Sequence, residues 1–423
     1  MTTGAQTNKP VRSPKPDRFG TQALHRNVWA TSITSFLMDV SSEMVLNILP
    51  LFLANVLGVK TSVIGLIEGV AEATASLLKV FSGWLSDKLR SRKWLAVAGY
   101  GLSTLAKPFF YFANSWEMVA GVRWADRVGK GIRTAPRDAL IADSSNEQQR
   151  GLAFGVQRAA DTAGAMFGLL IALGVVWLAQ ANAAALGAST FRTVVLISLI
   201  PAVLAVLALA LGAQEVPITG QRQVPKFAFR SLGRPFVVFM LIVGLFELGN
   251  SSDAFLVLRA QERGLSVLGV LGMLATFNLV YTLISTPAGS LSDRIGRRGI
   301  IVGGWLMYAA VYLGFGLARS GWQVWLLYAL YGLYYGLAYG TTKALIADLV
   351  PEAVRGTAYG TYNAVIGLLD FPASVIAGVL WQGIGAWGGF GAPAPFLFGA
   401  AVALLATLLL AAWLPRAVPE KGS

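Results

Sequence analysis

The sequence has no cysteine and a single histidine, His25. The missing thiols exclude disulfides and thiolate metal sites, and a lone histidine outside any ligand cluster predicts no metal site. Charge is also scarce, because only 13% of the 423 residues are charged while 55% are hydrophobic. A soluble domain of this length needs far less apolar surface, so the expected solvent is a lipid bilayer.

The chain contains many long apolar stretches. Stretches of roughly 20 residues, enough to cross a hydrocarbon core of about 30 Å, recur from Trp29 onward, and about twelve fit in the chain. The predicted fold class is an all-α polytopic membrane protein with twelve transmembrane helices in two six-helix bundles. The expected parts are a basic tail (1–27), two bundles (28–213 and 235–415), a linker between them (214–234) and a short tail (416–423).

The formal net charge of +13 is spread unevenly over the connectors between these stretches. Lys and Arg gather in alternate connectors, for example at Lys88, Arg150 and Arg298, and not on one soluble face, so nucleic acid is not an expected partner. By the positive-inside rule the basic connectors are cytoplasmic. We therefore expect a multi-pass protein of the inner membrane with both termini in the cytoplasm.

The two halves of the chain share short sequences at a spacing of 205 to 210 residues. Ser41-Ser42-Glu43 corresponds to Ser251-Ser252-Asp253, and an Ala-Leu-Ile-Ala-Asp element ends at both Asp143 and Asp348. An even number of spans in each half preserves orientation. The duplication therefore predicts parallel repeats that are related by an axis along the membrane normal.

One motif occurs once in each half, after the second and the eighth predicted span. The copies read Gly83-x-Leu85-x-Asp87-x-x-x-x-Arg92-Lys93 and Gly289-x-Leu291-x-Asp293-Arg294-x-Gly296-Arg297-Arg298. Together with the duplication, this arrangement resembles the major facilitator superfamily over essentially the whole chain from Trp29 to Pro415. The resemblance implies a monomeric secondary transporter that works by alternating access on a small-molecule substrate.

Two further stretches are similar to signatures of the same family, each with a departure. The stretch from Arg127 to Pro136 is similar to the helix 4 signature but has Lys130 where glutamine is usual. The glycines of the fifth span keep the spacing of the antiporter signature, whose proline is replaced by Leu169. This replacement leaves the direction of transport open.

Acidic residues inside the predicted spans are candidates for proton coupling, since a charge near the middle of a bilayer costs roughly 2.5 to 3.5 kcal/mol. Asp39 and Glu43 lie four residues apart on one helical face, where two carboxylates repel each other and favour holding a proton. Asp161 and Glu247 are further candidates. Alternatively, Asp39 holds the bundle together by pairing with a neighbouring arginine.

Candidate substrate-binding residues are basic in the first half and mainly aromatic in the second. They are Arg123, Arg127, Lys130, Arg158, Asp253, Tyr331 and Tyr335. Cations suit an anionic group and an aromatic wall suits an apolar part, although aromatic helix packing explains the tyrosines equally well. In the resembling family helices 1, 4, 7 and 10 line the cavity, which favours Glu247 and Asp253 over Glu68.

The duplicated motif and the end of the fourth span supply a candidate cytoplasmic gate. Its residues are Gly83, Asp87, Arg92, Arg133, Arg137, Gly289, Asp293 and Arg297. We expect Arg133 and Arg137 to form salt bridges with Asp87.

Three functional hypotheses follow. The leading one is proton-coupled export of a small amphiphilic compound, because no phosphate-binding loop or nucleotide-hydrolysing domain is found and neither a cofactor nor an enzymatic activity is expected. The second is proton-coupled uptake of an anionic solute such as an organic acid, a phosphate ester or a siderophore. The third is a membrane sensor or assembly factor without transport.

Overall fold

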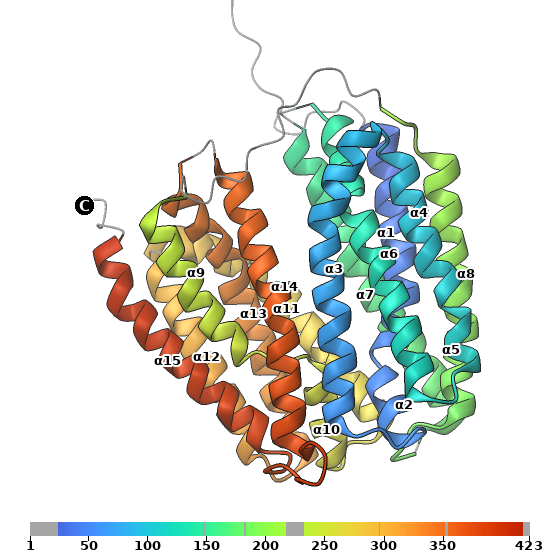
Figure 1. Ribbon diagram of the computed structural model, residues 1–423, viewed down its shortest axis with the longest axis vertical. Helices are drawn as coiled ribbons and strands as arrows, with labels where there is room; N and C mark the ends of the chain where they lie inside the picture. Colours follow the sequence, from blue (N-terminus) through green and yellow to red (C-terminus); the bar gives the residue numbers. More distant parts are fainter. Residues whose placement is uncertain are drawn as a thin grey trace, which may run out of the picture.

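The computed structural model describes residues 24–146, 149–181, 183–216, 232–295, 297–351 and 354–417. Within these ranges the chain forms fifteen helices and no strand, arranged as two bundles side by side (Figure 1). We call the end at which α1 begins and α15 finishes the termini end, and the opposite end the distal end.

The first bundle contains six spans, two of them broken. Its helices are α1 (Arg26–Leu46), α2 (Leu49–Asn55), α3 (Thr61–Leu89), α4 (Lys93–Ala106), α5 (Pro108–Phe112), α6 (Trp116–Asp143), α7 (Arg150–Gln180) and α8 (Ala188–Gly212). Pro50 lies in the first turn of α2, and Pro108 begins α5. Because proline has no amide hydrogen and clashes with the preceding turn, α1 and α4 end and a new helix starts at each proline.

The second bundle repeats this plan. Its helices are α9 (Gly233–Leu248), α10 (Ala254–Glu262), α11 (Val267–Ile295), α12 (Arg297–Leu317), α13 (Gly321–Leu349), α14 (Arg355–Gln382) and α15 (Ala394–Ala417). The seventh span is broken between α9 and α10, over 249–253, although no proline lies there. The break falls on the duplicated Ser-Ser-acid element, so the polar side chains of this element lie at the ends of helices.

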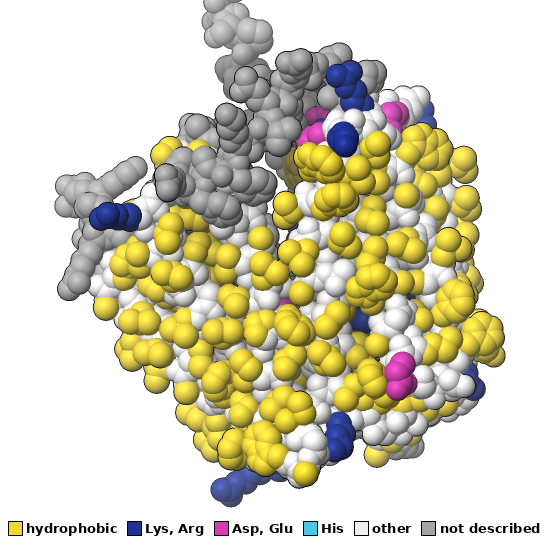
Figure 2. All heavy atoms as spheres, viewed as in Figure 1, with side chains coloured by type: hydrophobic (Ala, Val, Ile, Leu, Met, Phe, Trp, Pro, Cys, Tyr) yellow, Lys and Arg dark blue, Asp and Glu magenta, His cyan; other side chains and the backbone are white. Residues whose placement is uncertain are grey.

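The outer surface is suited to lipid. Seven of the described helical segments are long and apolar enough to cross a membrane by length and composition alone. Helices α3 and α6 are similarly long, with 29 and 28 residues, but they carry charges in their interiors. Hydrophobic side chains cover most of the face shown in Figure 2, while charged side chains gather mostly toward its upper and lower ends. The prediction of an all-α protein with twelve spans in two bundles is confirmed.

Helix packing follows a twofold pattern. In the first bundle α1 packs on α7 and α8, and in the second bundle α9 packs on α14 and α15. Between the bundles α3 packs on α14, and α7 packs on α11. Exchanging the two halves converts one of these inter-bundle contacts into the other, as the parallel repeats predict.

Neutral hydrogen bonds join the bundles at the distal end. The backbone amide and the hydroxyl of Thr61 both donate to Oε1 of Gln382, at 2.7 and 3.1 Å. Gln261 donates to the carbonyl of Ala184 at 2.8 Å. A Cβ atom on Gly378 would lie 2.7 Å from the carbonyl oxygen of Thr61, so α14 can approach α3 this closely only with glycine at that position.

Candidate functional site

A central cavity of about 320 Å³ lies between the bundles. Its first-bundle wall comes from α1, α2, α3 and α6, and its second-bundle wall comes from the α9–α10 break, α10, α11, α13 and α14. Its lining includes five carboxylates and three cations, namely Glu43, Glu68, Glu72, Asp253, Asp370, Arg123, Arg127 and Lys130. A cavity that both halves form is where a solute can contact both of them.

Two helix interruptions position the carboxylates of the duplicated element. Glu43 lies in the last turn of α1, where Nδ2 of Asn47 donates to its Oε2 at 3.1 Å. Asp253 lies directly before α10, and the hydroxyl of Tyr331 donates to its Oδ1 at 3.4 Å. Asp370 of α14 lines the same cavity. None of these three carboxylates forms an ion pair with a lysine or arginine in the part of the chain that the structure describes.

The two arginines of α6 that line the cavity are already neutralised by protein carboxylates. Arg123 lies 2.6 Å from Glu68 and 3.4 Å from Glu72, both on α3. Arg127 lies 3.1 Å from Glu72 and 3.0 Å from Asp126. The match arises because residues four apart on α6 face residues four apart on α3. Glu68 therefore lines the central cavity as the ion-pair partner of Arg123. From the sequence, Glu247 and Asp253 are favoured over Glu68 as lining residues.

The other two predicted substrate-binding cations are Lys130 and Arg158. Lys130 lines the central cavity and forms no ion pair with a described residue. Arg158 is exposed on α7 and is not among the residues that line the central cavity.

Asp39 and Asp161 lie outside the central cavity. Asp39 is half-buried where α1 packs against α7, and a Cβ atom on Gly164 would lie 3.1 Å from its Cβ. Asp161 accepts a hydrogen bond from Gln157 at 2.6 Å and lies 3.9 Å from Arg137. The helical face that Asp39 shares with Glu43 therefore does not bring Asp39 into the lining of the cavity.

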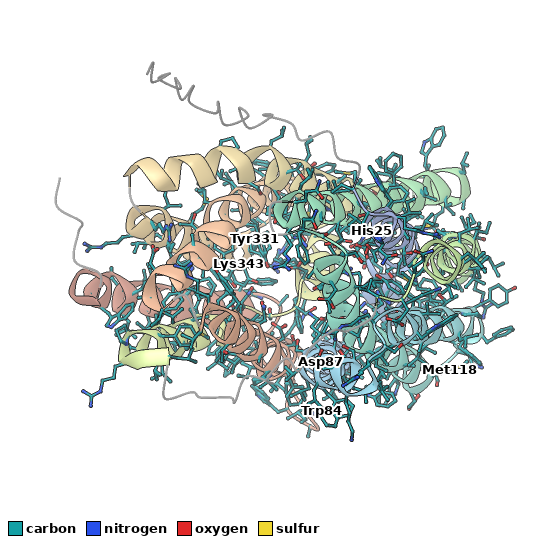
Figure 3. All side chains as sticks on the ribbon, turned by 90° about the horizontal axis from the view of Figure 1, so that it is seen from above. His25, Trp84, Asp87, Met118, Tyr331 and Lys343 are labelled. Carbon is teal, nitrogen blue, oxygen red and sulfur yellow. The ribbon has the colours of Figure 1, made fainter. Side chains whose placement is uncertain are left out.

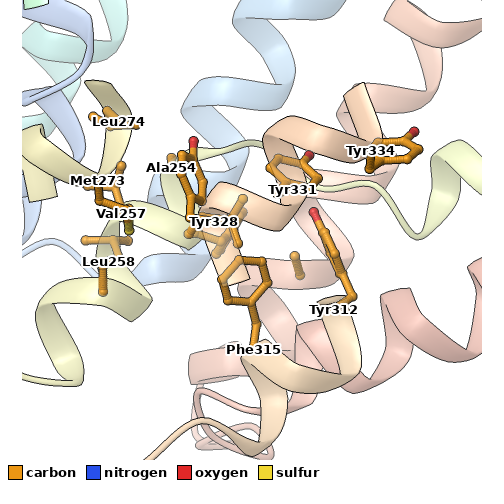
Figure 4. Packing of buried hydrophobic residues seen from close by; sticks show 14 of the residues in the cluster. Ala254, Val257, Leu258, Met273, Leu274, Tyr312, Phe315, Tyr328, Tyr331 and Tyr334 are labelled. Atoms are coloured by element: carbon orange, nitrogen blue, oxygen red, sulfur yellow. The ribbon is translucent and has the colours of Figure 1, made fainter. Parts of the chain in front are cut away.

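The tyrosines of α13 divide between lining and packing. Tyr328 and Tyr335 line the central cavity, whereas Tyr331 is fully buried and is not among the lining residues. In Figure 4 Tyr331 lies among Tyr328, Tyr334 and Tyr312, and its ring centroid is 5.0 Å from that of Tyr335. Only the hydroxyl of Tyr331, directed at Asp253, contributes to the site.

The gate residues pair differently from the expected pattern. Asp87 lies 2.5 Å from Arg92, whose Nε lies 3.3 Å from Asp143. The expectation that Arg133 and Arg137 pair with Asp87 is wrong for this conformation, because Arg92 is closer along the chain and is buried beside Asp87. Gly83 is not tightly packed, since a Cβ atom there would meet only Ala135, at 3.5 Å.

The two predicted gate arginines of α6, Arg133 and Arg137, instead bind partners within the first bundle. Arg133 donates to Ser103 at 2.7 Å and lies over the ring of Tyr100, 4.6 Å from its centroid. Arg137 donates to Ser35 and to Asp138, both at 2.9 Å.

The second half repeats one ion pair of the first. Arg297 pairs with Asp348, and these residues lie 205 positions after Arg92 and Asp143. In the ungapped motif the residue that matches Arg92 is the neighbouring Arg298. Gly289 and Asp293 belong to α11, but their side chains lie outside the described part of the structure. Seen from the termini end, Tyr331 and Lys343 lie toward the middle of the molecule and Trp84 lies at its rim (Figure 3).

One buried cation was missed by the sequence analysis. Lys107, only 2% exposed between α4 and α5, donates to Ser41 at 2.5 Å and to Ser42 at 3.1 Å. A lysine next to proline inside an apolar stretch was the available signal. The first Ser-Ser-acid element thus binds a lysine through its hydroxyls and directs its carboxylate into the cavity.

Comparison with known proteins agrees with this architecture. The model of the Major Facilitator Superfamily matches residues 31–371 and 252–423. An uncharacterized MFS-type transporter of Methanocaldococcus jannaschii is 36% identical over 393 residues, covering 92% of this chain and 94% of that protein.

Solved transporters share the fold at low sequence identity. A bacterial homolog of the human lysosomal transporter Spinster, inward-facing and unoccupied, is similar with a TM-score of 0.73 at 16% identity, covering 94% of this chain and 98% of that one. A POT family transporter in complex with 5-aminolevulinic acid has a TM-score of 0.74 at 14% identity, with coverage of 94% and 98%. The chain therefore belongs to the major facilitator superfamily and is a multi-pass membrane transporter.

Proposed function

We propose that the protein is a proton-coupled exporter of small amphiphilic solutes that works by alternating access in the inner membrane, with both termini in the cytoplasm. The observation that carries this proposal is the presence of Glu43, Asp253 and Asp370 in one cavity without cationic partners among the described residues. A carboxylate in such a place can hold either a proton or a positively charged group of a solute.

Competition for these carboxylates gives the proposed direction. If a proton and a cationic solute exclude each other, each binding event releases the other ligand, and the two flows run in opposite directions. Protons that enter the cell along their gradient then drive the solute outward.

The alternative of anion uptake has weaker support from the cavity. Arg123 and Arg127, the cations that would bind an anion, are engaged by Glu68, Glu72 and Asp126. Lys130 is the lining cation left for an anionic group within the described residues. Acidic groups therefore outnumber available cations.

The first Ser-Ser-acid element provides the test of coupling. Glu43→Gln keeps the volume of the side chain and its hydrogen bond with Asn47 but cannot release a proton. In proteoliposomes with an acidic interior, we expect wild-type protein to accumulate ethidium and to release protons in step. Glu43→Gln should lose this accumulation and keep ethidium counterflow, which needs no net proton movement.

Glu117→Gln is the matched control, because Glu117 is an exposed acid in the first turn of α6, outside the cavity. Its accumulation should equal that of wild type. Proton-driven accumulation that is unchanged in Glu43→Gln would remove Glu43 from the coupling mechanism.

A further inference from the structure

A second cavity, of about 190 Å³, lies within the second bundle next to the central one. Its lining comes from α9, α12, α13 and α14, together with Asn250 of the α9–α10 break. Two carboxylates, Glu247 and Asp370, face it, and no lysine, arginine or histidine is among its described lining residues. Glu247, which the sequence places among the candidates for proton coupling, faces this second cavity and does not line the central one.

The carboxylate of Glu247 is held in place but only half satisfied. Its residue is 7% exposed, and its Oε2 accepts a hydrogen bond from Nδ2 of Asn250 at 2.9 Å. The Asn250 amide is oriented in turn by the hydroxyl of Tyr308, which donates to Oδ1 at 3.1 Å. No described group donates to Oε1 of Glu247. A buried carboxylate is costly without a positive partner, so the missing partner is one that a ligand can supply.

Aromatic rings form much of the remaining wall. The rings of Phe246 and Trp305 are stacked with centroids 4.3 Å apart, and Tyr334 meets Tyr335 edge to face at 5.2 Å. Aromatic faces attract organic cations, most strongly where water is excluded. An inorganic cation needs several oxygen ligands instead, and the described residues contain no group of three or more acidic, histidine or cysteine side chains that could hold a metal ion.

The dimensions of the cavity indicate a head group and not a whole solute. Drug-sized ligands occupy pockets of roughly 300–1,000 Å³, which exceeds this chamber. Asn250, Tyr335 and Asp370 line both cavities, so a solute can extend from one into the other.

We propose that the second cavity binds the ammonium head group of an organic cation, with Glu247 and Asp370 as counter-charges and the rings as walls. The remainder of the solute lies in the central cavity. The inference rests on the proposed function in one respect, because it treats the head group as part of the transported solute.

The test uses two probes of the same shape, choline and its uncharged carbon analogue 3,3-dimethylbutan-1-ol. Binding to purified full-length protein in lipid nanodiscs is measured by calorimetry at one pH and without a gradient. We expect choline to bind wild type at least about tenfold more tightly than the analogue. Glu247→Gln and Asp370→Asn should each weaken choline binding about 10- to 30-fold, while Glu117→Gln leaves it unchanged.

Several results would overturn the assignment: no measurable choline binding to wild type, equal affinity for the two probes, or unchanged affinity in both Glu247→Gln and Asp370→Asn. The comparison of the two probes on wild type needs no variant to fold. The binding assay contains no proton gradient, so it is independent of coupling. Selective choline binding without proton flux in the transport assay contradicts only the proposed coupling. Proton flux without selective choline binding contradicts only the proposed ammonium site.

Discussion

The two bundles share one plan of helix packing, yet the buried arginines of α6 and the buried Glu247 of α9 differ in how their charges are compensated. In the first bundle the cations Arg123 and Arg127 are 5% and 3% exposed, and each has carboxylate partners on α3 or α6. In the second bundle Glu247 is 7% exposed with an amide partner and no described cation. The charges of these two arginines are therefore neutralised within the protein, whereas Glu247 can accept a positive charge that comes from outside.

The largest effect should come from opening the ion-pair network of the first bundle. Arg123→Gln leaves Glu68 buried without its cation, and breaking a buried pair by removing one partner costs about 3–5 kcal/mol. We expect a loss of this size in the free energy of unfolding, measured by denaturation of the purified protein with SDS. Glu68→Gln added to Arg123→Gln should recover much of the loss, because it removes the orphaned charge.

The control for this prediction is Arg192→Gln, which changes an exposed arginine of the same bundle that donates to the carbonyl of Tyr111. Its unfolding free energy should stay close to that of wild type. If Arg123→Gln is as stable as Arg192→Gln, the contrast between the bundles does not lie in buried ion pairs.

A smaller effect is expected at the ion pair that both halves share. The side chain of Arg92 is 3% exposed and binds Asp87 and Asp143, whereas that of Arg297 is 29% exposed and pairs with Asp348. Arg92→Gln should cost about 2 kcal/mol or more, and Arg297→Gln about 1 kcal/mol or less, in the same unfolding measurement. Equal losses at the two positions would show that burial does not distinguish these repeats.

The smallest effect concerns the orientation of Asn250 in the second bundle. Tyr308→Phe removes the hydroxyl that donates to Asn250 and, at 3.2 Å, to the carbonyl of Gly249. Stability should fall by about 1 kcal/mol, and choline affinity should fall less than in Glu247→Gln, since the carboxylate itself remains. Tyr281→Phe, at a half-buried tyrosine of α11, is the reference. A choline affinity as low as that of Glu247→Gln would show that the orientation of Asn250 matters as much as the charge of Glu247.

Much of the fold could be predicted from the sequence because bilayer thickness and duplication act on whole segments. The spacing that relates Arg92 to Arg297 also relates Asp143 to Asp348, and the structure joins both pairs. Partner choice was harder, since it depends on which face each helix turns to its neighbour. Distance along the sequence favours Arg92 over Arg133 as the partner of Asp87, but it does not show which arginine faces Asp87 in the fold.

The cavity lining was predictable only in part, for a related reason. Glu43 and Asp253 were found because duplication marked them, but no pattern separated the cavity of Asp253 from that of Glu247. This separation depends on the break at 249–253, where no proline signals the interruption. Lys107 escaped notice because its partners, Ser41 and Ser42, lie more than sixty residues earlier in the chain.

The contacts that close the distal end bear on how readily the transporter could change state. Thr61, Gln382, Gln261 and Ala184 are joined by hydrogen bonds between uncharged groups. Each such bond contributes only about 0.5–1.5 kcal/mol once water replaces the lost partner. Breaking these bonds therefore leaves no charged group without a partner. The free energies of the open and closed states can then differ by only a few kcal/mol, and solute binding can reverse a difference of this size.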